Sequence, residues 1–232
     1  MHLEKTPLGY EIRTPSVTIF LGGSQAQLAQ LTTAYPEFDF VRVKQTHSDL
    51  VIRTIDPKND LKIEADAHYS AQKNIALCVV TADCVPLFFY DNQTGLIAGV
   101  HAGWRGVASR IIPKTIAELV GFGAKPQNID VVIGPHIQKR NFEVGINVRD
   151  QILASLGPLS EEDRTLFYNP TTDEKGHLDL NLVVQTQLQQ SGIQMDRLFC
   201  MYLDTYSSPD FHSHRRDKEL AGRQVSFICR TR

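Results

Sequence analysis

The chain has 232 residues, of which 42% are hydrophobic and 22% charged, and its 24 Lys and Arg against 26 Asp and Glu give a formal net charge of −2. That length is sufficient for one domain with a hydrophobic core, and the near-neutral balance argues against binding of a nucleic-acid polymer by bulk charge. No apolar run approaches the roughly 18 residues of a membrane span, and the first residues lack the apolar segment of a secretory signal, so we expect a cytoplasmic protein with free thiols.

Eight apolar runs, bounded by Asp, Asn, Gly or Pro, predict β-strands. In chain order they cover residues 17–21, 50–55, 76–81, 87–90, 96–100, 130–133, 198–203 and 224–229. The polar segment 91–95 predicts a hairpin connection, and residues 1–40 are expected to form a strand-bearing edge of the same domain. Apolar spacing predicts helices over 107–120 and 180–190, with a weaker one over 147–156.

Strands and helices that mix without strict alternation favour an α+β fold. No repeat, low-complexity run or linker divides the chain, so we expect a single domain over residues 1–232. Mixed, largely antiparallel sheets with covering helices are the expected architecture.

Two segments place chemistry-bearing side chains at the ends of expected strands. Residues 81–86 read TADCVP, which puts Asp83 and Cys84 at a strand–strand transition, because Pro86 constrains the residue before it to an extended conformation. Residues 44–49 read KQTHSD and place His47 just before a strand. Each has an ordinary explanation, since a lone Cys is more often a buried thiol and a lone His a hydrogen-bonded surface residue.

A third segment, GVHAGWRG at residues 99–106, lies between an expected strand and an expected helix. Such a turn of small residues can direct backbone N–H groups at an anion, and Arg105 would strengthen that site. The same residues could equally form a tight turn with an aromatic plug. Taken alone, none of the three segments justifies a functional assignment.

Taken together, these motifs resemble the YfiH-type laccase-domain family. The similarity runs from residue 41 almost to the C-terminus and is carried by KQTHSD (44–49), ADAHYS (65–70), CVVTADCVPLFFYD (78–91), GVHAGWRG (99–106), IGPHIQKRNFEVG (133–145), LDLNLVVQTQL (178–188) and FHSHRRDKELAGRQVSFI (211–228). Members of this family have been called polyphenol oxidases, laccases and peptidoglycan editing factors, and are associated with purine nucleoside phosphorolysis and adenosine deamination. The resemblance implies an α/β/α-like layered sandwich with mixed sheets.

By position, the resemblance implies that His47, Cys84 and His101 bind a zinc ion. Two imidazoles and one thiolate suit zinc, and three protein ligands leave a fourth position open, as in catalytic zinc sites. The remaining cysteines, Cys78, Cys200 and Cys229, are expected to be inert thiols.

The first implied reaction is phosphorolysis of adenosine, inosine, guanosine and methylthioadenosine to free base and ribose 1-phosphate. Attack of phosphate on the ribose requires cations and amides around the oxyanion. Arg105 is the first candidate, Arg215 and Arg216 are second, and Lys44 and Gln45 are candidates for holding ribose or phosphate near His47.

The second implied reaction is deamination of adenosine, in which the metal would activate water. A carboxylate must move the proton, and Asp83 is the candidate, with a strand-end hydrogen bond as an equal alternative for it. The expected partners are a purine nucleoside and phosphate, whereas the oligomeric state, monomer or small homo-oligomer, stays open.

Three other functions compete with this interpretation. A copper-dependent polyphenol oxidase could use the same ligands, but none of the three methionines lies in these motifs as an axial ligand, and His-x-His occurs only at 212–214. A hydrolase of peptidoglycan precursors would use Cys84 as nucleophile with His101 or His47 as base. In a non-enzymatic alternative, zinc only stabilises an interaction module.

Overall fold

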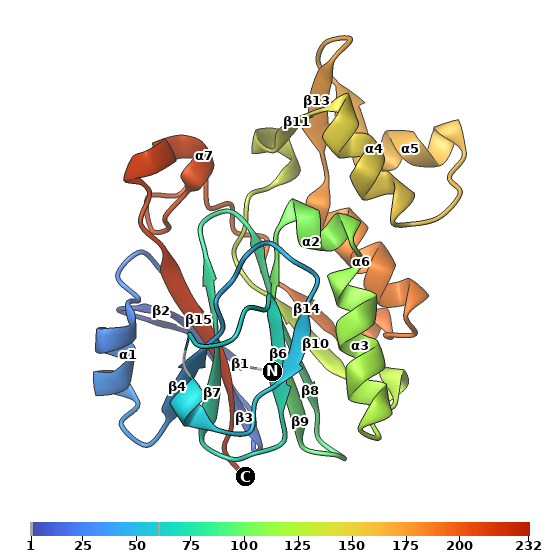
Figure 1. The fold of residues 1–232 in the computed structure, drawn as a ribbon. Coiled ribbons are helices and arrows are strands. Elements are labelled where there is room, and N and C mark those ends of the chain that lie inside the picture. Colours follow the sequence, from blue (N-terminus) through green and yellow to red (C-terminus); the bar gives the residue numbers. More distant parts are fainter. Residues whose placement is uncertain (1, 60) are drawn as a thin grey trace.

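The computed structural model describes residues 2–59 and 61–232. Its elements form four layers: two six-stranded β-sheets pack face to face, and helices cover the two outer faces (Figure 1). The expected α+β class, with mixed and largely antiparallel sheets in one domain, is confirmed. The resemblance implies an α/β/α-like sandwich, and in the structure the β layer of that sandwich consists of two sheets packed face to face.

The first sheet contains both ends of the chain. Its strand order is β1 (His2–Thr6), β2 (Gly9–Arg13), β3 (Val17–Gly22), β15 (Gln224–Arg230), β7 (Ile75–Thr81) and β4 (Asp39–Arg42). Only the β4–β7 pair in this sheet is parallel.

The second sheet bears the central hairpin of the fold. Its strand order is β14 (Leu198–Cys200), β10 (Asp130–Ile133), β8 (Val85–Asp91), β9 (Leu96–Ala102), β6 (Ala67–Ser70) and β5 (Val51–Arg53). The edge pairs β10–β14 and β5–β6 are parallel and the inner pairs are antiparallel. A small third sheet consists of β11 (Glu143–Gly145), β13 (Lys175–Leu178) and β12 (Tyr168–Pro170).

Helices lie on the outer faces of the two large sheets and beside the small one (Figure 1). They are α1 (Leu28–Ala34), α2 (Trp104–Ala108), α3 (Ile111–Gly121), α4 (Ile146–Ala154), α5 (Glu161–Phe167), α6 (Leu180–Gln190) and α7 (His214–Asp217). Short 3₁₀ helices cover Pro57–Asn59, Pro126–Asn128, Lys139–Asn141, Met195–Arg197 and Lys218–Leu220. No helix within the described residues is long and apolar enough to cross a bilayer.

Side chains alternate between two cores along the central strands, as the two-residue period of a strand requires. In β7, Ile75, Leu77 and Val79 pack between the sheets, whereas Ala76 and Cys78 face α1. In β8 the same alternation sends side chains to the core between the sheets and to the core beneath α3 and α6. These strands are buried on both faces, which is why their sequences are nearly continuous apolar runs.

All eight expected strands are present, although the runs at 50–55 and 198–203 form only three-residue strands. The hairpin at 91–95 is also present, and Gly95 provides its left-handed residue with φ of 72°. Helices expected over 180–190 and 147–156 are found as α6 and α4.

The prediction of a single helix over residues 107–120 is wrong. The chain is helical from Trp104, stops at Ser109, and starts again at Ile111, because Arg110 adopts a left-handed backbone with φ of 64°. Both halves still bury apolar side chains in one core, so the apolar spacing alone does not reveal the break.

Candidate metal centre

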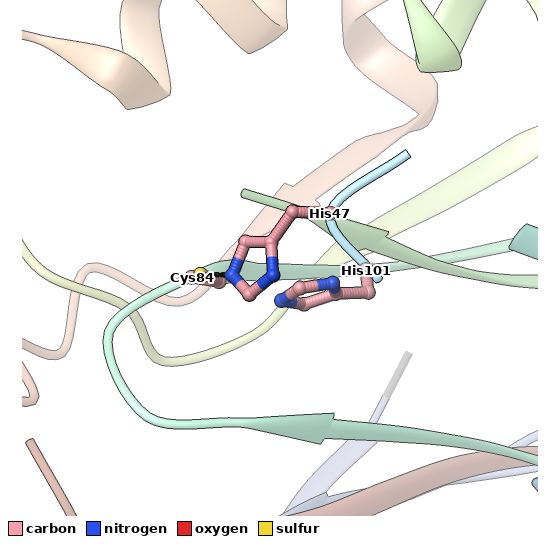
Figure 2. Close-up of side chains that lie close together, drawn as sticks. All are labelled: His47, Cys84 and His101. Atoms are coloured by element: carbon pink, nitrogen blue, oxygen red, sulfur yellow. Dashed lines mark hydrogen bonds between the residues drawn. The ribbon is translucent and has the colours of Figure 1, made fainter. Parts of the chain in front are cut away.

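The three expected metal ligands come from segments that are far apart in the sequence. His47 lies in the loop after β4, Cys84 in the turn that connects β7 of one sheet to β8 of the other, and His101 near the end of β9. Antiparallel pairing places His101 opposite Pro86, and therefore next to the turn that bears Cys84. The three side chains point toward one another (Figure 2).

Their ligand atoms all lie within 4.8 Å of one another, and no other such group of three or more occurs among the described residues. The Cys84 Sγ is 3.9 Å from the His47 Nε2, and the two imidazole rings are nearly perpendicular with centroids 4.9 Å apart. Two nitrogens and one sulfur at this separation fit a single ion with one coordination position left open.

Gly103 keeps the space between the ligands empty. A Cβ atom at this position would lie 2.9 Å from His47 Cδ2, 3.3 Å from Cys84 Sγ and 3.6 Å from His101 Cε1. Any side chain at residue 103 would therefore crowd all three ligands, which gives a steric reason for glycine here.

Asp66 orients two of the ligands from beneath. Its buried carboxylate accepts a 2.7 Å hydrogen bond from His101 Nδ1, which leaves Nε2 for a metal. The same carboxylate accepts the backbone N–H groups of Thr46, His47 and Ser48 at 2.6–3.1 Å, and also the Ser48 hydroxyl. These bonds hold His47 in a left-handed conformation with φ of 60°, which is unfavourable without such support.

Electrostatics among the three side chains favour a charged thiolate. Burial alone would raise the pKa of Cys84, but the two neighbouring imidazoles lower it to about 6. Burial also lowers the pKa of His101, while the Cys84 thiolate and Asp66 outweigh that effect and raise the pKa. The thiolate is the form of cysteine that binds metals.

The ligands open into a cavity of about 760 Å³ with a strongly cationic wall. Within the described residues the lining includes one carboxylate, that of Asp83, and five basic side chains, which are Arg42, Lys44, Arg105, Arg215 and Arg223. Apolar side chains, among them Trp104 and Phe142, form other parts of the wall. A site with this charge suits an anion beside an apolar ligand.

Two expected phosphate-binding residues lie in this wall with their guanidinium groups over aromatic rings. The Arg105 guanidinium carbon is 4.5 Å from the centroid of Trp104, and that of Arg215 is 5.6 Å from the centroid of Phe142. The Arg215 Nη1 also donates to the carbonyl of Glu143 at 2.9 Å. Such contacts hold both charged groups at the cavity.

Lys44 and Gln45 also line the cavity, but their side chains have partners in the protein. Lys44 pairs with exposed Glu64 at 2.8 Å. The Gln45 amide donates to the Val80 carbonyl and accepts the Val80 N–H, both at 2.8 Å, which ties the His47 loop to β7.

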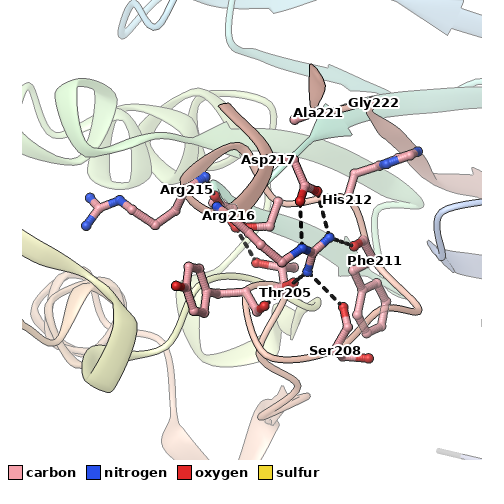
Figure 3. A network of polar contacts seen from close by, with 12 residues as sticks. Thr205, Ser208, Phe211, His212, Arg215, Arg216, Asp217, Ala221 and Gly222 are labelled. Atoms are coloured by element: carbon pink, nitrogen blue, oxygen red, sulfur yellow. Dashed lines mark hydrogen bonds and ion pairs between the residues drawn. The ribbon is translucent and has the colours of Figure 1, made fainter. Parts of the chain in front are cut away.

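Arg216 lies outside the lining of the cavity. Its guanidinium donates to the carbonyls of Thr205, Tyr206, Ser208 and Phe211 and pairs with Asp217 (Figure 3). All three of its nitrogens are thereby occupied. Arg216 therefore stabilises the loop before α7.

Asp83 lines the cavity beside Cys84 and is 9% exposed. Its two carboxylate oxygens accept the Thr205 hydroxyl and the Arg215 backbone N–H, both at 2.6 Å. A hydrogen-bonding role is the expected alternative to proton transfer by Asp83, and these two bonds are contacts of that kind.

Sequence reasoning missed Asp66 and Gly103, although both lie in motifs that carry the family resemblance, ADAHYS and GVHAGWRG. An acid directly before a strand and a glycine in a turn have ordinary explanations. Their roles depend on the pairing of β6 with β9, which brings Asp66 beneath His101.

A family model described as multi-copper polyphenol oxidoreductase laccase matches residues 23–231. A Bacillus subtilis protein named purine nucleoside phosphorylase YlmD is 36% identical over 165 residues, which are 70% of this chain and 58% of that protein. A Deinococcus radiodurans protein named purine nucleoside phosphorylase is 34% identical over 193 residues, 82% of this chain and 70% of that protein.

Solved structures share the fold over nearly the whole chain. The Bacillus licheniformis protein YfiH superimposes with a TM-score of 0.83 at 25% identity and covers 92% of both chains. YlmD from Geobacillus stearothermophilus gives a TM-score of 0.87 at 23% identity and covers 99% of both chains.

Proposed function

Because this chain belongs to the multi-copper polyphenol oxidoreductase laccase family, and because it is similar to proteins named purine nucleoside phosphorylase, we propose that it is a zinc-dependent purine nucleoside phosphorylase. In the proposed reaction a phosphate oxygen forms a bond to C1′ of the ribose, and the bond from C1′ to the purine nitrogen breaks. The products are the free base, which takes up a proton, and ribose 1-phosphate. Adenosine, inosine, guanosine and methylthioadenosine are the proposed substrates.

The observation that carries this proposal is the charge of the cavity. Three of the arginines in its lining, Arg105, Arg215 and Arg223, pair with no carboxylate among the described residues, in a protein whose net charge is −2. Hydrolysis or deamination of a neutral nucleoside needs no such excess of cations, whereas phosphorolysis must bind a phosphate dianion close to the sugar.

The ligand set fits zinc. His47, Cys84 and His101 would hold the ion, Asp66 would fix the His101 tautomer, and Gly103 leaves room for the ion. When bound, zinc would supply Lewis-acid chemistry at the open coordination position.

Other residues of the cavity would bind the phosphate, the purine and the ribose. Arg105 and Arg215 are proposed to hold phosphate, because their guanidinium groups are fixed at the cavity by aromatic rings. The apolar part of the wall, which includes Trp104 and Phe142, suits the purine. Lys44 and Gln45 would border the ribose.

Copper chemistry is the main competitor, since the family's description names it. A multinuclear copper site needs several groups of ligands, and the described residues contain one group of three. Hydrolysis by a Cys84 nucleophile is the second competitor, because the thiol lies beside two imidazoles.

Adenosine deamination at the same metal is a second proposed activity. A carboxylate near the ligands would have to carry the proton. Asp83 lines the cavity, but both of its carboxylate oxygens already accept hydrogen bonds, so we assign this step to no residue. Release of ammonia from adenosine without phosphate tests this activity separately.

The proposal is tested by incubating metal-free protein, reloaded with zinc or with copper, with inosine or adenosine in the presence and absence of phosphate. We expect free base and ribose 1-phosphate only with zinc and phosphate together. Oxidation of a phenol by the copper-loaded protein, without phosphorolysis by the zinc-loaded protein, would overturn it in favour of an oxidase. Activity that survives a chelator and is lost on thiol alkylation would favour the hydrolase.

A further inference from the structure

Asp83 connects the metal-ligand turn to two segments that frame the cavity. Its Oδ1 accepts the Thr205 hydroxyl and its Oδ2 accepts the backbone N–H of Arg215, both at 2.6 Å. Its backbone carbonyl accepts the N–H of Ile137 at 3.0 Å. One residue therefore ties the loop before α7, the first turn of α7 and the 134–138 segment to the turn that holds Cys84.

The backbone of Asp83 also has an uncommon conformation. Its φ is 83°, in the left-handed region that is uncommon for non-glycine residues, although Asp, Asn and His adopt it more readily than others. His47, on the other side of the proposed metal centre, also has a positive φ. The hydrogen bonds of the Asp83 side chain are compatible with this backbone and connect it to neighbouring segments.

Both partners of Asp83 donate to its carboxylate. The Arg215 backbone N–H can only donate, and the Thr205 hydroxyl donates to the other oxygen, both at 2.6 Å. Asp83 is therefore an acceptor that joins two separate segments.

Arg215 is the residue whose position Asp83 determines. Asp83 holds its backbone N–H, Phe142 lies under its guanidinium, and the Asn141 and Glu143 carbonyls hold Nη1. Its Nε and Nη2 make no hydrogen bond within the described part of the chain, and its side chain extends away from the Arg216 network (Figure 3). Two donor nitrogens at the cavity are thus left for an oxyanion.

We infer that Asp83 is a positioning residue for phosphate binding: through the Arg215 backbone and Thr205 it sets where the Arg215 guanidinium meets phosphate relative to the metal centre. The inference rests on the proposed function for the identity of the anion. It assigns no proton transfer to Asp83.

Substitution of Asp83 by Asn distinguishes positioning from proton transfer. An asparagine amide can accept the Arg215 N–H and donate to the Thr205 oxygen, so it preserves both contacts, and Asn tolerates a left-handed backbone. It cannot carry a proton at neutral pH. We expect zinc-loaded D83N to keep kcat, the KM for phosphate and the pH profile within about twofold of the wild type.

Substitution of Asp83 by Gly removes the tether while it allows the same φ. For D83G we expect the KM for phosphate to rise at least about tenfold, with the KM for inosine within about twofold. Thr205→Val should change the same constant in the same direction by less. The Arg215 amide should exchange its hydrogen at least about tenfold faster in D83G and at the wild-type rate in D83N.

Asp91 provides a matched control, because its buried carboxylate also accepts one backbone N–H and one threonine hydroxyl, at the β8–β9 hairpin. Asp91→Ala should lower the thermal midpoint without altering the KM for phosphate. Loss of turnover in D83N together with a missing limb of the pH profile would overturn the inference. Unchanged Arg215 exchange and phosphate KM in D83G would also overturn it.

Failure of the proposed function gives a different result. In that case the wild type forms no ribose 1-phosphate, whereas calorimetric titration with inorganic phosphate and the Arg215 exchange rate still report on Asp83. Weaker phosphate binding in D83G than in D83N supports positioning even then, and equal binding overturns it.

Discussion

Asp66 is the residue that organises the proposed metal centre, because its buried carboxylate accepts hydrogen bonds from the His47 loop and from His101 together. Burial alone would raise its pKa, but the bonds from His101 and Ser48 lower the pKa to about 2 from 3.8. A lowered folded-state pKa stabilises the protein above the unfolded pKa and ceases to do so as pH falls through the folded one.

We therefore predict that Asp66 stabilises the metal-free fold by about 2 kcal/mol at neutral pH, and that this contribution disappears between about pH 4 and pH 2. Urea unfolding across pH 2–6 measures it. The free energy of unfolding should fall more steeply with acid in the wild type than in Asp66→Asn, and parallel curves would contradict the assignment.

Substitution of Gly103 tests whether metal binding requires the space between the three proposed ligands. Gly103→Ala places a methyl group against His47 and Cys84, so we predict that the variant folds but loses at least about tenfold in zinc affinity. Gly121→Ala is the matched control, because a Cβ there meets nothing within 4 Å. It should bind zinc like the wild type, and equal affinity in both variants would show that the space is unimportant.

The sequence predicted some of these residues and not others for physical reasons. His47, Cys84 and His101 have no ligand spacing of their own, so only the family resemblance joined them. Asp66 is one of 26 acidic residues, and nothing but the three-dimensional pairing of strands distinguishes it. Nothing in the sequence distinguished Arg215 from Arg216. In the structure Arg216 binds backbone carbonyls of the loop before α7, whereas Arg215 lines the cavity.

At the scale of elements, the short α2 and its break from α3 decide where Arg105 lies. The first helix begins directly after the metal ligand segment, and Arg110 ends it in a left-handed conformation. Apolar spacing located the strands and the buried helix face well, because burial follows the period of each element. It could not locate the break, since arginine gives no local signal for a left-handed backbone.

We predict that Arg110→Gly raises the free energy of unfolding by up to about 1 kcal/mol, because glycine adopts the left-handed conformation without a steric penalty. Ala117→Gly, at an exposed position inside α3, should lower it by about 1 kcal/mol. Denaturant unfolding of both variants measures the difference. Destabilisation of similar size in both would contradict the account of the break.

At the scale of the whole molecule, the proposed metal ligands lie mostly outside the apolar cores. His47 is exposed, and Cys84 is half-buried and belongs to none of the three apolar clusters, whereas His101 is buried. The net charge of −2 likewise gave no hint of the cationic cavity, because a sum over the chain conceals how charges are distributed.

We therefore predict that chelation abolishes turnover and leaves the fold intact. Far-ultraviolet circular dichroism of the chelated protein should match that of the loaded protein at 25 °C, although the thermal midpoint falls because bound metal stabilises the folded state. Restored activity on addition of zinc controls for damage by the chelator. Unfolding on chelation would instead support a purely structural metal.

The central claim is that His47, Cys84 and His101 hold one metal ion on which phosphorolysis depends. The most direct measurement follows ribose 1-phosphate by phosphorus NMR while zinc is titrated into metal-free protein with inosine and phosphate. We predict that the rate rises with zinc, reaches its maximum at about one ion per chain, and stays at background in Cys84→Ser. Ribose 1-phosphate formed at full rate without metal, or by Cys84→Ser, would contradict the account.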